Sequence, residues 1–168
     1  MIKYVNHTTL EDVREEIVSH IKHEMERRTY LAANELRNAA QLVLRGQRSG
    51  RRYKVPGTYR RQRDKTDGKM KNGRYYTASA PGEPPANRLG HFRQSWQPNA
   101  RIEDGVYTSM IESDLTVGTT NKRLLGDILE EGTPRMAPRP YQELILDRAT
   151  NKIKRIYSAP YFDGGTND

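Results

Sequence analysis

The chain has 168 residues, a net charge of +8 and no cysteine. Leu, Ile, Val and Phe make up about 18% of it, below the roughly 20% at which chains begin to lose the ability to fold alone. This composition excludes a disulfide framework, a thiolate metal site and a cysteine nucleophile, and no apolar run approaches the ~18 residues of a membrane span. We expect a single soluble domain, residues 1–168, with a small core and polar extensions that become ordered on partners.

The N-terminal part of the chain predicts one long helix, residues 8–46. Two overlapping capping boxes are possible at its start, from Thr8 to Glu11 and from Thr9 to Asp12, and Gly46 is suited to end it. About 36 residues would extend roughly 54 Å, which is too long for so small a domain to bury. We therefore expect one end to pack on the sheet and the rest to contact other subunits. The apolar residues of that remaining part are Leu10, Val13, Ile17 and Ile21.

Residues 47–77 are predicted to be a basic hairpin or loop insertion. Eleven basic residues lie between Arg48 and Arg74 against two aspartates, so this segment carries the whole net positive charge. Residues 51–55 and 74–78 are expected to be the arms of a hairpin. Between them lies a polar tip. Its cationic side chains are Arg60, Arg61, Arg63, Lys65, Lys69 and Lys71.

Three interpretations of the basic insertion stay open. A solvated loop would only keep the protein soluble. Tyr53, Tyr59, Tyr75 and Tyr76 are interleaved with the cations and suit either cross-strand pairing or stacking on bases. The charge has no sequence specificity, so it would attract phosphates or an acidic protein surface.

Two proline-bracketed segments, 78–86 and 131–141, are called here the first and second proline connectors. Proline fixes φ and removes an N–H, so neither connector can be the middle of a helix or of a central strand. Ordered extended segments lose little freedom on binding and therefore suit chains that dock against neighbours. The residues that we expect at subunit contacts there are Pro81, Glu83, Pro84, Pro85, Arg135, Pro138 and Arg139.

Residues 78–157 are expected to form an α+β core with short helices that flank a small antiparallel sheet. Asn87 would cap a short helix that Pro98 ends, and residues 102–111 and 115–119 read as strands joined by a turn at 113–114. Residues 124–131 predict a second helix, and Pro140 would take the first position of the last one. The tail 158–168 is expected to be flexible. The expected core residues are Phe92, Trp96, Leu144, Ile145, Ala149 and Ile153.

Few residues have the spacing of a catalytic or metal site. His20, His23 and Glu24 lie close together, but not in the His-Glu-x-x-His order that presents two imidazoles and a base to zinc. His91 lies one turn from Ser95 without a carboxylate to orient it. We expect no enzyme, no metal and no cofactor. Glu130 is interpreted as a surface or intersubunit contact.

The order of the motifs resembles a family of bacteriophage proteins. The stretch Ser79–Pro85 followed by Leu89–Trp96 is similar to the first half of the small tail-component proteins of lambdoid-type tailed phages. Val117–Thr119, Leu129–Thr133 and Met136–Tyr141 are similar to the second half. The resemblance covers about residues 8–157 of the chain. The family consists of tail-completion or neck proteins, whose genes lie between head-joining and tail-tube genes.

The resemblance implies a non-enzymatic virion protein. Its expected form is a homo-oligomeric ring, sixfold or twelvefold, at the head–tail junction of the virion. Before assembly we expect it in the host cytoplasm. Its expected partners are adjacent connector or adaptor, terminator or tail proteins and packaged DNA, with no membrane. The tip of the basic insertion would then face DNA, and its base, Arg51–Lys54 with Arg74, an acidic surface. The alternative is a non-specific nucleic-acid-binding module that uses residues 48–74.

Overall fold

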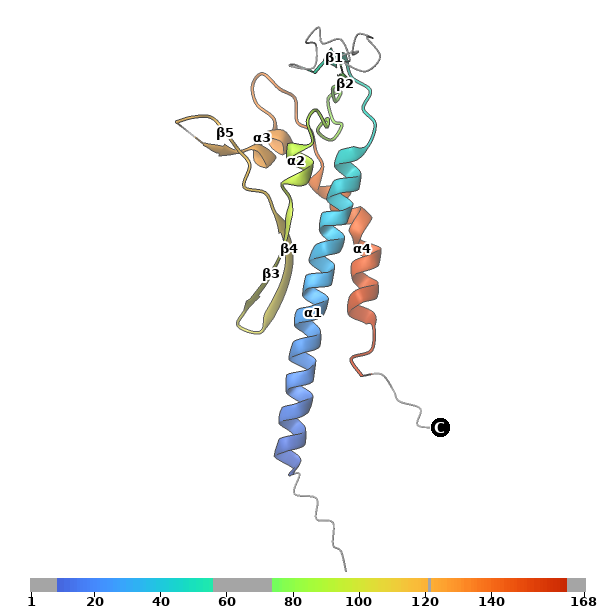
Figure 1. The fold of residues 1–168 in the computed structure, drawn as a ribbon, viewed down its shortest axis with the longest axis vertical. Helices are drawn as coiled ribbons and strands as arrows, with labels where there is room; N and C mark the ends of the chain where they lie inside the picture. Colours follow the sequence, from blue (N-terminus) through green and yellow to red (C-terminus); the bar gives the residue numbers. More distant parts are fainter. Residues whose placement is uncertain (1–8, 56–73, 121, 163–168) are drawn as a thin grey trace, which may run out of the picture.

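One long helix, α1 (Leu10–Arg45), runs the length of the molecule, and the other elements lie beside it or at its C-terminal end (Figure 1). The computed structural model describes residues 9–55, 74–120 and 122–162. Their elements are one long and three short helices with small antiparallel sheets. The predicted α+β class with a long N-terminal helix is therefore confirmed.

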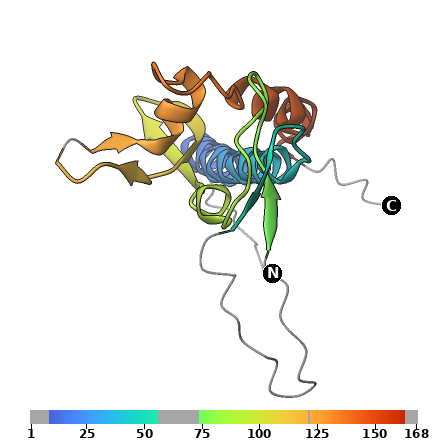
Figure 2. The same cartoon turned by 90° about the horizontal axis from the view of Figure 1, so that it is seen from above.

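Helix α1 begins at the second of the two possible capping boxes. The Thr9 hydroxyl accepts from the Asp12 amide at 3.1 Å, and the Asp12 carboxylate accepts from the Thr9 amide at 2.7 Å. The helix has 36 residues, the length expected from the sequence. One face of its C-terminal half is buried and rich in alanine, which lets other elements approach closely. Figure 2 looks along α1 and shows α4 on one side of it and the β3–β4 hairpin on another.

The described strands form three two-stranded antiparallel sheets. Strands β1 (Arg52–Lys54) and β2 (Tyr75–Thr77) pair with Tyr53 opposite Tyr76, so the predicted hairpin arms are confirmed. Strand β3 (Gln97–Glu103) pairs with β4 (Val106–Glu112), and β5 (Thr116–Val117) pairs with β6 (Arg123–Leu124).

The predicted strand 102–111 is wrong because it runs through a turn. Asp104 and Gly105 have φ angles of 50° and 78°, the left-handed values of a tight hairpin turn, and they separate β3 from β4. Pro98 does not end a helix but lies in β3 opposite Ile111. A two-stranded sheet consists of edge strands, in which proline is tolerated.

The short helices also begin and end at different residues from those expected. Helix α2 (His91–Gln94) is a single turn that starts after Gly90 at φ 91°, so Asn87 does not cap it and Trp96 lies beyond it. Helix α3 (Leu125–Glu131) ends at Gly132, as predicted. Helix α4 (Gln142–Ser158) starts after Tyr141, so Pro140 precedes the helix instead of opening it.

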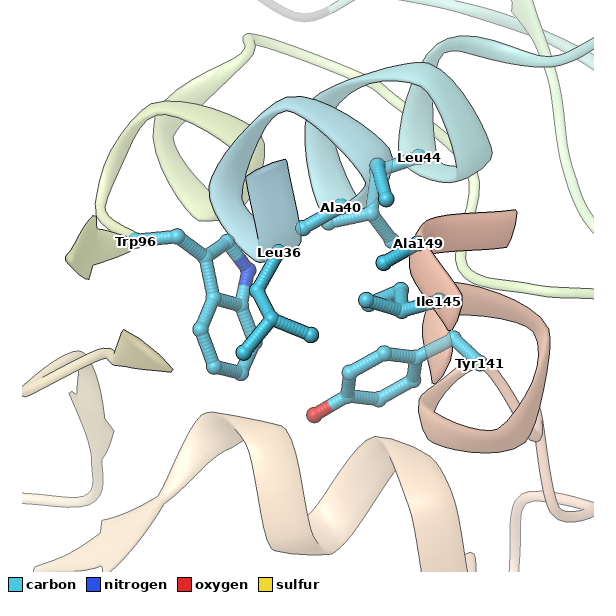
Figure 3. Close-up of a cluster of buried hydrophobic side chains, with 8 residues drawn as sticks. Leu36, Ala40, Leu44, Trp96, Tyr141, Ile145 and Ala149 are labelled. Atoms are coloured by element: carbon cyan, nitrogen blue, oxygen red, sulfur yellow. The ribbon is translucent and has the colours of Figure 1, made fainter. Parts of the chain in front are cut away.

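The core lies between α1 and α4 and is closed by two aromatic side chains (Figure 3). Trp96 and Ile145 are buried as predicted, and Ala149 is too. Leu144 is 45% exposed, so the prediction that it belongs to the core is wrong. The remaining predicted members, Phe92 and Ile153, are partly buried against the cluster. The core members that were not predicted are Leu36, Ala39, Ala40, Leu44 and Tyr141.

The chain beyond α4 turns back onto α1 as far as it is described. Arg28 is 2% exposed and donates to the carbonyl oxygens of Ala159 and Pro160, both at 2.6 Å. Its guanidinium also lies 4.0 Å from the centre of the Tyr161 ring. Residues 159–161 are therefore docked, contrary to the expected flexible tail, and 163–168 lie outside the described residues.

Candidate functional site

Three of the five side chains weighed as catalytic or metal candidates have hydrogen-bond partners within the chain. Glu24 accepts from Arg28 at 2.8 Å, and His20 Nε2 lies 3.0 Å from the carbonyl oxygen of Tyr161. Ser95 donates to a carbonyl of α2. Within residues 9–55, 74–120 and 122–162, no three His, Asp or Glu side chains are grouped to hold a metal.

The two proline connectors contact each other. The Gly82 amide donates to the Pro138 carbonyl at 3.2 Å, and the Arg139 guanidinium donates to the Ser79 carbonyl at 2.9 Å. The Ser79 hydroxyl in turn donates to the Pro84 carbonyl at 2.7 Å. Two segments that lack regular backbone pairing are thus held in one shape by one backbone bond and by side-chain hydrogen bonds.

Charged side chains tie the first connector to the end of α1. The Glu83 carboxylate accepts from the Ser49 hydroxyl at 2.6 Å, the Ser49 amide at 3.0 Å and the Ala80 amide at 2.9 Å. These bonds, the Ser49 hydroxyl first, lower the pKa of Glu83 from 4.5 to about 2. Arg48 donates to the Pro85 carbonyl at 3.2 Å. The connector is therefore fixed before any partner arrives.

Glu130 is an internal capping residue, which corrects the prediction of a surface or intersubunit role. Its carboxylate accepts from the Tyr141 amide at 3.0 Å and the Gln142 amide at 3.4 Å, at the N-terminal end of α4. Negative charge is favourable at that end of a helix. Because Glu130 lies in α3, eleven residues before Tyr141, local capping patterns could not reveal this role.

Some of the predicted contact residues of the connectors lie on the surface and others lie in the interior. Pro81, Arg135 and Pro138 are exposed, Glu83, Pro84 and Arg139 are half-buried, and Pro85 is buried. The buried and half-buried members are those that hold the connectors together. Their role in subunit contacts stays a prediction, now centred on the exposed members.

The base of the basic insertion combines arginines with exposed tyrosines. The Arg51 guanidinium lies 5.6 Å from the centre of the Tyr53 ring, and that of Arg52 lies 4.4 Å from the centre of the Tyr75 ring. Tyr53 and Tyr76 stack with ring centres 5.8 Å apart. The tyrosines thus pair across the strands and also contact cations. The six cationic tip residues, Arg60, Arg61, Arg63, Lys65, Lys69 and Lys71, lie outside the described residues.

Residues 10–21 of α1 extend beyond the other described elements and are called the projecting part of α1 (Figure 1). Leu10 is 90% exposed, and Val13, Ile17 and Ile21 are 41%, 43% and 36% exposed. Helical spacing places all four on one stripe. Among the residues that the structure describes, the other elements of the chain leave this stripe exposed.

A hollow lies near the opposite end of α1, between the first proline connector and α2. Its volume is about 200 Å³. Leu44, Pro85 and Phe92 contribute apolar walls, and Arg88 and Arg93 are the cations that line it.

Comparisons with known proteins found no relative. Neither a protein-family model, nor a curated protein, nor a solved structure matches the chain. Among the described helices, none has the length and apolar character that a membrane span requires. Function is therefore inferred from the chain's own surfaces.

Proposed function

We propose that the chain is a structural, non-enzymatic subunit of a phage virion, in the neck, head–tail connector or tail-completion ring. The observation that carries the proposal is the exposed aliphatic stripe of the projecting part of α1. Apolar stripes of this kind are stabilised when another chain covers them. Copies of the same chain in a closed ring supply that cover to one another.

Two further features support an assembly role. The proline connectors are held in shape by hydrogen bonds that Arg139 and Ser79 donate and that Glu83 accepts, so they lose little conformational freedom when a neighbour docks. The motifs of these connectors are also those that resemble phage tail-completion proteins. In such a ring the exposed Pro81, Arg135 and Pro138 would face adjacent connector, terminator or tail proteins at the head–tail junction.

Deleting the gene from the phage that encodes the chain tests the proposal. We expect filled heads and tails that fail to join, and we expect the wild-type gene supplied in trans to restore joined particles. Ile17→Asp with Ile21→Asp should fail to restore them, because charge on the stripe opposes burial. Val106→Asp, at an exposed apolar residue of the β3–β4 hairpin, is the matched control and should restore them. Joined particles that lack the protein would contradict the proposal.

Non-specific nucleic-acid binding is the second candidate, favoured by the arginine–tyrosine pairs at the base of the insertion. Phosphates would pair with the cations and bases could stack on exposed Tyr53 and Tyr75. Fluorescence anisotropy with short duplexes at rising salt concentration tests it. The candidate requires tight binding by the isolated chain that weakens steeply with salt, and weak binding at low salt would exclude it.

A further inference from the structure

Helices α1, α2 and α4 together form a groove, called here the polar groove, whose volume is about 600 Å³. Among the described residues that line it, Leu42 is the only apolar side chain, and no carboxylate is present. The other lining residues are three cations and three carboxamides: Arg45, Arg93, Lys152, Asn38, Gln41 and Gln94. The groove therefore presents positive charge together with many N–H donors, which suits an anionic ligand.

The positive charge of the groove is largely left over by the chain. Among the described residues, no carboxylate forms an ion pair with Arg45 or Arg93, whereas Lys152 Nζ lies 2.8 Å from Glu35 Oε2. Arg148 is exposed and lies one helical turn before Lys152, on the same side of α4. One carboxylate thus faces four cations in and beside the groove.

The groove continues to the base of the basic insertion. Arg93 lines both the polar groove and the hollow between the first proline connector and α2. Arg88 lines that hollow and also lies over the Tyr76 ring at 5.9 Å, and Tyr76 stacks on Tyr53. Figure 1 shows α2, the C-terminal end of α1 and the β1–β2 hairpin at the same end of the molecule. This surface is called the cationic track, and its cations are Lys152, Arg45, Arg93, Arg88, Arg51 and Arg52.

The lining of the groove favours a nucleic acid over a protein partner. Protein interfaces have an apolar core, and Leu42 alone would contribute little to one. Interfaces with nucleic acids are more polar and much more positively charged. Arginine, lysine and carboxamide N–H groups are the side-chain donors that phosphate oxygens commonly accept from. Phosphates therefore match the groove better than an acidic protein surface does.

The hollow and the exposed tyrosines distinguish a single strand from a duplex. The hollow has apolar walls from Pro85 and Phe92 and a volume of about 200 Å³. Tyr53 and Tyr75 are 44% and 47% exposed. Unstacked bases can enter such a hollow or stack on such rings, whereas a duplex keeps its bases paired inside. Only a single strand can use all parts of the track.

We propose that the cationic track binds a single-stranded nucleic acid, with phosphates along the polar groove and at Arg88 and one base in the hollow. This inference rests on the second candidate function and names its ligand and path. The assembly function does not depend on it.

Fluorescence anisotropy of the full chain with a labelled thymidine oligonucleotide, and with a duplex of the same length, tests the proposal. The wild-type chain should bind the single strand about tenfold more tightly than the duplex. Arg45→Gln with Arg93→Gln should raise the dissociation constant of the single strand about tenfold or more. The slope of its logarithm against log salt should fall by about 1.4, since each phosphate contact of a single strand contributes about 0.7.

Arg14→Gln with Lys22→Gln is the matched control because it removes the same charge from exposed positions of α1. These residues lie about 34 Å or more along the helix from Arg45, well beyond the Debye length of about 8 Å at physiological salt. The control should therefore bind like wild type and keep the wild-type salt slope. Circular-dichroism melts of both double variants check that each is folded.

Photo-cross-linking gives a second test that does not depend on charge. An oligonucleotide with iodouracil in place of thymine is irradiated with the wild-type chain, and the adducts are mapped by mass spectrometry. We expect adducts at His91 or Phe92, which line the hollow. Adducts confined to residues 47–77 would place the strand on the insertion alone and would overturn the track.

The outcomes separate the inference from the functions proposed above. Equal binding by the groove variant and its control, or a duplex bound as tightly as the single strand, would overturn the track and leave the second candidate function standing. A chain that binds neither probe at low salt would overturn both. A chain that binds polyglutamate but no oligonucleotide would place an acidic protein segment in the groove and would also overturn the inference.

Discussion

At the scale of single residues, two carboxylates hold the backbone of the proline connectors, which lack regular backbone pairing. Glu83 accepts hydrogen bonds from one hydroxyl and two backbone amides where the end of α1 meets the first proline connector. Glu130 accepts hydrogen bonds from two backbone amides where the second connector meets α4. Charge-assisted bonds of this kind are stronger than neutral ones, so each carboxylate fixes a segment that we expect to face partners.

Glu83 should make stability depend on pH. Its folded pKa of about 2 lies below the ordinary 4.5, so its stabilising contribution is complete above about pH 4.5 and is lost as the pH falls towards 2. Glu83→Gln should therefore lower the free energy of unfolding at neutral pH, and the difference from wild type should shrink with acidification. Urea denaturation at a series of pH values measures it. Glu26→Gln, at an exposed residue of α1, is the control, and an equal pH-dependent loss there would refute the assignment.

Gly126 is required because Tyr141 approaches it closely. A Cβ at Gly126 would lie 2.8 Å from the Tyr141 hydroxyl oxygen, and burial raises the pKa of that tyrosine to about 12. Gly126→Ala should destabilise the fold by about 1–3 kcal/mol through overpacking. Adding Tyr141→Phe removes the clashing atom and should recover much of the loss in thermal unfolding. Equal destabilisation with and without the hydroxyl would show that the contact is not the cause.

Residue identities in the core were only partly predictable. Trp96, Ile145 and Ala149 were found from apolar spacing, and all three are buried. Leu144 shares the apolar character of its neighbour, but α1 covers only one side of α4, and adjacent helical positions point about 100° apart. Tyr141 was missed because it follows a proline connector, where no periodic pattern exists to mark a buried residue.

At the scale of elements, the small core depends on three aromatic rings. Trp96, Phe92 and Tyr141 meet edge to face, with ring centres 5.5–5.9 Å apart. They close one side of the space between α1 and α4. Edge-to-face packing contributes beyond the burial of area alone, which matters in a chain with so few large aliphatic residues.

Trp96→Ala should therefore cost about 3–5 kcal/mol of unfolding free energy, a large share of a small domain's stability. Leu144→Ala, in a side chain that is 45% exposed, should cost much less and is the matched comparison. Chemical denaturation of both variants measures the difference. Similar losses at the two positions would contradict the packing described here.

The elements themselves were predictable where a local signal exists. Helix α1 and the β1–β2 hairpin follow from apolar periodicity and turn residues, and both are confirmed. The predicted strand 102–111 runs through the β3–β4 turn, although Asp104-Gly105 is a strong hairpin signal. The docking of Arg28 on the backbone after α4 joins residues about 130 positions apart, which no local pattern contains.

At the scale of the whole molecule, the two halves of α1 differ in how far other elements of the chain cover them. The C-terminal half of α1 is enclosed by α4 and the β3–β4 hairpin, whereas the projecting part continues the same helix into solvent. Composition already indicated a small core, but only the packing of α4 and the hairpin shows where along α1 that core ends. Cover of the projecting part by another chain is therefore the central feature of the proposed assembly.

A reconstruction of the assembled particle by electron cryo-microscopy tests this claim most directly. We predict that Leu10, Val13, Ile17 and Ile21 lose most of their exposed area to a neighbouring chain. An assembled particle in which these four side chains stay in solvent, or are covered only by their own chain, would contradict it.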